Sequence, residues 1–195
     1  DVMKELENVI IYADAQKCIG CHSCELACAV AHGGKGGLIG AVINKQPLHP
    51  RIKVVEADGV IMPMQCRQCE NAPCAMVCPT GACRQENGQV MIVESNCVGC
   101  KLCVMVCPFG AITVRRDSFK DDGSSTNQGV ALKCDLCTSW CAENNKKDTA
   151  CVEACPTKAI SLIKMQEYRT ALLQARAKEL AQSHKHMNMT LRKLR

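Results

Sequence analysis

Residues 97–108 read Cys-Val-Gly-Cys-Lys-Leu-Cys-Val-Met-Val-Cys-Pro, which places cysteines at Cys97, Cys100, Cys103 and Cys107. Gaps of two, two and three residues followed by proline form a ligand pattern for a cubane [4Fe–4S] cluster. Where two such clusters occur together, the first three cysteines hold one cluster and the fourth, before proline, ligates the other. The stretch therefore predicts both a cofactor and a partner motif elsewhere in the chain.

Similar spacing recurs three more times, so that sixteen of the 18 cysteines belong to four motifs. The first motif spans residues 18–28, the second 66–78, and the fourth is divided between 134–137 and 151–155. All motifs but the first end in Cys-Pro. We therefore expect four [4Fe–4S] clusters. The predicted cluster-binding and iron ligands are Cys18, Cys21, Cys24, Cys28, Cys66, Cys69, Cys74, Cys78, Cys97, Cys100, Cys103, Cys107, Cys134, Cys137, Cys151 and Cys155.

Disulfides and zinc are the alternative explanations for so many cysteines. The cysteines are bunched at gaps of two and three residues, whereas a disulfide framework usually spaces them around loops. Residues 1–6 carry charges where a secretory signal needs an apolar stretch. Isolated Cys-x-x-Cys pairs also suit zinc. Since only five residues are Phe, Tyr or Trp, the core needs support besides apolar burial, and bound metal supplies it.

Charge and hydropathy bear on the partners and the compartment. The formal charge of +5 counts every cysteine as neutral, but each cluster with its four thiolates adds about −2, so four clusters bring the protein to about −3. Nucleic-acid binding therefore loses its support. No apolar run approaches the roughly 18–20 residues of a transmembrane helix. We expect a cytoplasmic protein without a membrane span, although a chain exported behind a twin-arginine signal would have the same processed sequence.

Short apolar runs flank the motifs, and the third and fourth cysteines of each motif enclose one predicted helical turn. Strands are predicted at residues 9–12, 90–93, 111–114 and 160–163. The pattern predicts an α+β fold of two pseudo-symmetric, bacterial-ferredoxin-like dicluster units built around the clusters. Insertions at residues 33–60 and 115–131 separate motif one from two and three from four. Within a four-cluster domain of residues 1–163, the predicted organisation is an inner unit of residues 61–115 and an outer unit of residues 1–60 with 116–163.

The tail, residues 164–195, is predicted to form a basic helix, because it lacks Gly, Pro and Cys and holds eight Lys or Arg against two Asp or Glu. Apolar and other residues follow alternating spacings of four and three, as at the seam of a coiled coil. The seam consists of Leu173, Ala177, Leu180, His184, Met187, Leu191 and Leu194. The sequence leaves two alternatives for this helix: it packs on its own domain, or it docks to another subunit or another copy of the chain.

Three stretches carry a resemblance to a family. Residues 17–32, 134–137 and 150–156 are similar to the four-cluster ferredoxin-like subunits of oxidoreductases, above all the electron-transfer subunit of CO dehydrogenase and the small iron–sulfur subunits of formate dehydrogenase–hydrogenase complexes. The resemblance covers residues 9–163. It implies a subunit that relays electrons between a hydrogenase, a formate dehydrogenase or a CO dehydrogenase, and that has no catalytic residue of its own. A diffusing polyferredoxin shuttle and a scaffold assembled through the tail are the alternative functions.

The same resemblance implies which cysteines share a cluster, because in that family motif one pairs with four and motif two with three. The outer sets are Cys18, Cys21 and Cys24 with Cys155, and Cys134, Cys137 and Cys151 with Cys28. The inner sets are Cys66, Cys69 and Cys74 with Cys107, and Cys97, Cys100 and Cys103 with Cys78.

Several other residues near the motifs are weaker candidates for a functional role. Cys83 is interpreted as a small buried hydrophobe, and Cys141 is the alternative to Cys151 as the third ligand of motif four. His22 and His32 are interpreted as surface or hydrogen-bonding residues beside the first motif. Lys101 has two interpretations of equal weight: it raises the potential of its cluster, or it is solvated. Trp140 is interpreted as a buried residue, and packing at a cluster or at a partner surface is the alternative.

Overall fold

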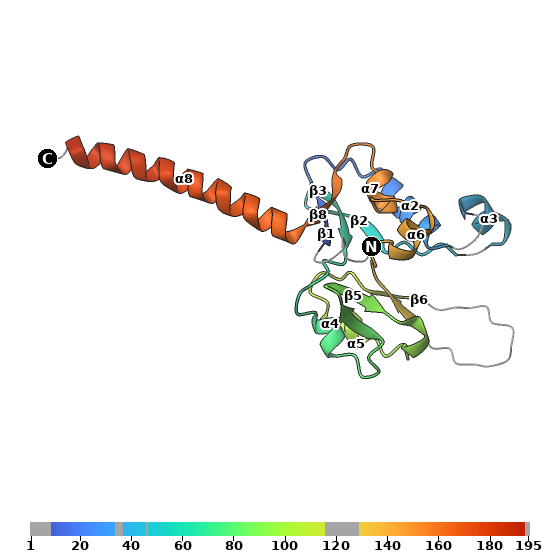
Figure 1. Cartoon of the computed structure of the whole chain (residues 1–195). Helices are drawn as coiled ribbons and strands as arrows, with labels where there is room; N and C mark the ends of the chain where they lie inside the picture. The colour runs from blue at the N-terminus through green and yellow to red at the C-terminus, as the bar shows by residue number, and fades with distance from the viewer. Residues whose placement is uncertain (1–8, 34–36, 46, 116–128, 194–195) are drawn as a thin grey trace.

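The computed structural model describes residues 9–33, 37–45, 47–115 and 129–193, with the backbone alone over residues 185–193. Residues 1–6, most of the predicted loop at 115–131, part of the glycine run after Gly33, and Leu194 of the seam lie outside this part. Figure 1 shows two lobes of short strands and helices, with one long helix extending away from them. The predicted α+β class is confirmed.

Eight strands in the described residues form four antiparallel sheets of two strands each. The sheets are β1 (Val9–Ala13) with β8 (Ile160–Lys164), β2 (Ile52–Ala57) with β3 (Val60–Gln65), β4 (Cys83–Glu86) with β5 (Gln89–Ile92), and β6 (Thr113–Arg115) with β7 (Val130–Leu132). A two-stranded sheet is marginal by itself in water. The fold therefore depends on what joins these sheets.

The sheet of β1 and β8 brings the two ends of the domain together, with Ala13 opposite Ile160. Along β1 the side chains of Val9, Ile11 and Ala13 are buried and Tyr12 between them is exposed, which is the alternation of a half-buried strand. The predicted strands at residues 9–12 and 160–163 are confirmed. The outer unit is thus closed by segments from opposite ends of the sequence.

Single helical turns lie at the third cysteine of three motifs, as predicted. They are α4 (Pro73–Met76), α5 (Leu102–Val106) and α7 (Ala150–Glu153). In the first motif, α2 (Ser23–Ala31) instead continues beyond Cys28. The reason is that Ala29 stands where the other motifs have proline, which cannot continue a helix.

The insertion at residues 33–60 has more structure than its glycine run indicates. It contains α3 (Gly37–Ile43) and β2, whose Ile52 is buried in the core of the outer unit. Two strand pairs cross the predicted unit boundaries, because β3 pairs with β2 and β7 pairs with β6. The boundaries at residues 61 and 115 stay a prediction.

Cysteines form much of both cores. The core of the outer unit packs Ile11 and Leu136 around Cys24, Cys28 and other cysteines, and that of the inner unit packs Val90 and Ile112 around cysteines. Cys66, from the inner unit, packs into the outer core, so the two units adjoin there.

The predicted tail helix is confirmed as α8 (Met165–Lys193), which follows β8 directly and projects away from both lobes (Figure 1). Residues 166–184 are exposed, and Leu173 and Leu180 of the seam are 71% and 61% exposed. An ion pair between Arg169 Nη2 and Glu70 Oε1 at 2.8 Å joins the start of the helix to the loop that carries Cys69. None of the helices described is both long and apolar enough to cross a bilayer.

Candidate iron–sulfur cluster sites

The first cysteine group joins the two ends of the outer unit. Cys18, Cys21 and Cys24, on the loop before α2 and its first turn, line one cavity together with Cys155, which ends the fourth motif. Val54 and Pro63 contribute apolar walls. Four thiols converging on one apolar space are the donor set of a [4Fe–4S] cluster. We refer to Cys18, Cys21, Cys24 and Cys155 as group 1.

The second group has the same construction in the inner unit. Cys66, Cys69, Cys74 and Cys107 line one cavity and form group 2. Val90, Phe109 and Ile112 line it as well. The Arg67 guanidinium lies 6.0 Å from the centre of the Phe109 ring, at cation–π distance.

A third cavity is lined by Cys97, Cys100, Cys103 and Cys78, which form group 3. Cys83 also lines this cavity, but its thiol interacts with that of Cys74 of group 2, which raises the pKa of Cys83. Cys83 is buried, in agreement with its interpretation as a core residue.

Group 4 consists of Cys28, Cys134, Cys137 and Cys151, all buried. Electrostatic interactions join Cys137 to Cys28 and Cys151, and Cys134 to Cys137 and Cys151. Burial raises the pKa of the Cys151 thiol to about 11, and burial together with neighbouring thiolates raises the pKa of Cys137 above its usual range. With raised pKa values these cysteines hold their protons near neutral pH, and a bound metal ion would replace those protons and stabilise the thiolates.

Cys141 lies apart from group 4. Its Sγ is 3.5 Å from the Asp148 carbonyl oxygen and 4.0 Å from that of Leu136, within reach of weak S–H donation. Its side chain packs in a small cluster with Ala150. The charges that act on it come from Glu153, Asp135 and Asp148, whereas Cys151 interacts with Cys28.

The groups lie in neighbouring pairs. Cys24 of group 1 interacts electrostatically with Cys151 of group 4. In the inner unit Cys103 of group 3 interacts with Cys74 of group 2. Group 1 thus adjoins group 4 and group 2 adjoins group 3, and each group takes its members from two motifs.

Backbone N–H groups point at the fourth cysteine of every motif. Three donors follow locally in the chain: Cys83 N to Cys78 Sγ at 3.2 Å, Ala111 N to Cys107 Sγ at 3.5 Å, and Ala159 N to Cys155 Sγ at 3.2 Å. Cys28, which has no Cys-Pro turn, receives its hydrogen bond from Arg51 N at 3.2 Å. Donors aimed at sulfur stabilise thiolate and tune cluster potential.

An ion network lies beside group 4. Asp135 Oδ1 accepts a hydrogen bond from His32 Nε2 at 2.9 Å, and Oδ2 accepts one from Arg51 Nη1 at 2.5 Å. Burial alone would lower the pKa of His32, but hydrogen bonds to Asp135 and Cys28 raise it to about 10. Burial would raise the pKa of Asp135, yet the hydrogen bond and charge of His32 and the charge of Arg51 lower it to about 2. The network is therefore ionic near neutral pH.

The remaining candidates have ordinary surroundings. His22 Nδ1 lies 3.1 Å from Glu25 Oε2 at the surface, and Lys101 is exposed. Trp140 packs, partly buried, in the cluster of Cys137 and Cys141. The sequence analysis did not identify Arg51 or Asp135 as functional residues. The sequence offers only their positions as an indication, because Asp135 lies between two predicted ligands and Arg51 lies in a predicted insertion.

Comparison with known families gives two matches. Residues 57–165 match the family described as "4Fe-4S dicluster domain", and residues 15–31 match "4Fe-4S binding domain". Both matches include cysteines of the groups above, so the predicted [4Fe–4S] cofactors are confirmed, and the sixteen cysteines of the motifs are consistent with four clusters.

Several relatives are similar over most of the chain. The "Iron-sulfur protein" of Rhodospirillum rubrum is 62% identical over 183 residues, covering 94% of this chain and 96% of the relative. The "Electron transport protein HydN" of Escherichia coli is 42% identical, covering 78% and 86%. "Formate hydrogenlyase subunit 2" of the same species is 34% identical, covering 80% and 82%. The chain belongs to the ferredoxin-like 4Fe-4S dicluster family of electron-transfer proteins.

Proposed function

We propose that this protein is a subunit that relays electrons through four [4Fe–4S] clusters, one held by each of groups 1 to 4. The observation that carries this proposal is the convergence of four cysteines, drawn each time from two motifs, on a common space. The assignment of four cysteines to group 4 is supported by their burial and by the electrostatic interactions among their thiols. When bound, each cluster accepts and releases one electron, and the chain supplies ligation, spacing and tuning.

The order of the relay follows from which groups adjoin. Groups 1 and 4 are neighbours in the outer unit, and groups 2 and 3 in the inner unit. Gln68, between two ligands of group 2, donates a hydrogen bond from Nε2 to the carbonyl oxygen of Cys134 in group 4 at 3.0 Å. We therefore propose the order 1–4–2–3. Cys21 of group 1 and Cys100 of group 3 are exposed, which supports electron entry and exit at these two ends.

The partners we propose are redox enzymes of an anaerobic complex. The similarity to formate hydrogenlyase subunit 2 supports a formate dehydrogenase–hydrogenase assembly. A CO dehydrogenase partner is the narrower alternative, and it rests on the resemblance of residues 17–32 to that family's electron-transfer subunit. In each case the chemistry takes place in the partner.

A role in assembly is the second candidate, and it is compatible with the first. The specific observation is α8, whose residues 166–184 are exposed and project from the body. A freely diffusing shuttle has no need of a basic helix with an exposed apolar seam, so α8 favours a docked subunit over a shuttle.

Two measurements test the proposed function. Protein purified without oxygen should contain about 16 irons per chain, four for each of four clusters. Co-purification from the native host, with partners identified by mass, should recover a catalytic redox subunit. An iron content corresponding to two clusters would contradict the ligand groups, and recovery of the protein alone would favour the shuttle.

A further inference from the structure

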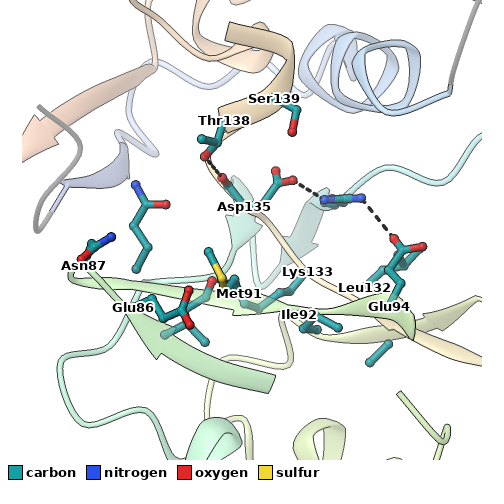
Figure 2. A pocket seen from close by; sticks show the side chains of 14 residues that line it. Glu86, Asn87, Met91, Ile92, Glu94, Leu132, Lys133, Asp135, Thr138 and Ser139 are labelled. Carbon is teal, nitrogen blue, oxygen red and sulfur yellow. Dashed lines mark hydrogen bonds and ion pairs between the residues drawn. The ribbon is translucent and has the colours of Figure 1, made fainter. Parts of the chain in front are cut away.

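Lys133 is a buried lysine at the place where the two units adjoin. Its side chain is 3% exposed, and its Nζ donates hydrogen bonds to the carbonyl oxygens of Val90 and of Cys134, the latter at 2.8 Å. Val90 belongs to β5 of the inner unit, and Cys134 belongs to group 4. Lys133, Asp135 and residues of β5 line one cavity of about 320 Å³, and Figure 2 shows Lys133 beside β5, with Asp135 farther from that strand.

Gln68 completes a ring of hydrogen bonds around this lysine. Its Nε2 donates to the same carbonyl oxygen of Cys134, and its Oε1 accepts from the Val90 N–H at 2.8 Å. Gln68 lies between Cys66 and Cys69, two members of group 2. The ring therefore connects the ligand loop of group 2 to a ligand of group 4.

Among the residues that the structure describes, Lys133 forms no ion pair with a carboxylate, and Asp135, which lines the same cavity, is paired with His32 and Arg51. Burying an ammonium without a counter-ion is unfavourable, and hydrogen bonds to two carbonyl oxygens offset only part of that cost. Its charge acts on the thiols of Cys74 and Cys83, on the inner side of the junction. An anionic group on each side of Lys133 would balance it, and reduced iron–sulfur clusters are such groups.

We propose that the Lys133 ammonium is the electrostatic bridge between the two units, which raises the reduction potentials of the clusters in groups 2 and 4. The inference rests on the ligand groups proposed above. In the step concerned, one electron leaves the reduced cluster of one group, which returns to its oxidised state, and reduces the oxidised cluster of the other. No bond or proton changes place. Lys133 is a positioning residue that stabilises the electron on either side of the crossing.

The test compares two Lys133 variants with two controls in the holo-protein. Lys133→Gln keeps a hydrogen-bond donor and removes the charge, and Lys133→Met removes both. Lys101→Met removes a charge beside Cys100, where the lysine is exposed and screened by water. Gln68→Leu breaks the same ring without removing a charge. Midpoint potentials are read from redox titrations followed by EPR, with iron content measured on every sample.

We expect both Lys133 variants to keep about 16 irons while the equilibrium constant for reduction of one or two clusters falls at least tenfold, which is 59 mV for a one-electron couple. Lys101→Met should change this constant less than about threefold. Gln68→Leu, which keeps the charge of Lys133, should change it less than either Lys133 variant does. Unshifted potentials in both Lys133 variants would overturn the proposal, as would an equal shift in Gln68→Leu. Loss of clusters in both Lys133 variants, with Gln68→Leu intact, would also overturn it, because Lys133 would then be structural. A wild-type protein with fewer than four clusters would instead refute the ligand groups.

Discussion

The backbone N–H of Arg51 lies 3.2 Å from Cys28 Sγ, although the two residues are 23 positions apart in the chain. In the other motifs a residue four or five positions after the cysteine supplies this hydrogen bond. The insertion that contains Arg51 thus replaces the Cys-Pro turn that the first motif lacks. It also brings the Arg51 guanidinium to Asp135 beside group 4.

The two roles of Arg51 can be separated by a pair of substitutions. Arg51→Ala and Arg51→Pro both remove the ion pair with Asp135, but only proline removes the N–H donor. One hydrogen bond contributes about 0.5–1.5 kcal/mol, so Arg51→Pro should lower the potential of one cluster by a further ~20–60 mV. EPR-monitored redox titration of the two variants measures the difference. Identical potentials would show that the N–H group does not tune the cluster.

Shared ligation between distant motifs predicts non-additive loss of iron. Cys155→Ser and Cys18→Ser each remove a ligand of group 1, so the double variant should lose no more than one cluster, about four irons. Cys155→Ser with Cys28→Ser affects groups 1 and 4 and should lose about eight. Iron and labile sulfide analysis of anaerobically purified protein distinguishes these outcomes. Additive loss in the first pair would contradict the proposed groups.

The choice between Cys141 and Cys151 has its own test. Cys151→Ser should reduce the iron content by about four or convert one cluster to a three-iron form, because Cys151 lies among the thiols of group 4. Cys141→Ser should keep all four clusters, since its thiol faces the carbonyl oxygens of Asp148 and Leu136. Cys83→Ala serves as the matched control, a buried cysteine outside every group. The reverse pattern would assign Cys141 to the cluster.

Deleting residues 166–195 should leave the cluster content unchanged and reduce the size of the native assembly. The described side chains of α8 are exposed from residue 166 to 184, and no cysteine lies in this segment. Light scattering after size-exclusion chromatography, together with partner recovery, measures the effect. The full-length double variant Leu173→Ser with Leu180→Ser should have the same effect if the apolar seam makes the contact. Unchanged mass and partner retention in both would remove the docking proposal.

The sequence predicts those parts of the protein that are set by local spacing. Cysteine gaps predict the motifs, the prolines after Cys78, Cys107 and Cys155 predict where the helical turns end, and apolar runs predict β1 and β8. The pairing of motif one with four was available only through family resemblance. Which residues of β1 pair with which residues of β8 is decided by the tertiary structure, and a short stretch of sequence does not contain that information.

The residues around the cysteine groups were harder to predict for the same reason. Arg51 reaches Cys28 from an insertion whose glycines indicated a loop, and the structure of β2 there depends on pairing with β3. Lys133 and Gln68 are adjacent to ligands in the sequence, but polar residues beside ligands are usually solvated. Only the junction between the two units shows that both side chains are buried.

Because β1 pairs with β8, the part of the fold that contains groups 1 and 4 can close only late in synthesis. All eight cysteines of groups 2 and 3 have been synthesised once residue 107 emerges, whereas groups 1 and 4 await Cys151 and Cys155. Val9 meets its partner Lys164 only when nearly the whole domain has been made. Because folding proceeds from the N-terminus during synthesis, the cysteines of residues 18–28 are the first made and the last closed. In the proposed groups 1 and 4, these four cysteines therefore wait for their partner ligands longer than any other cysteines of the chain.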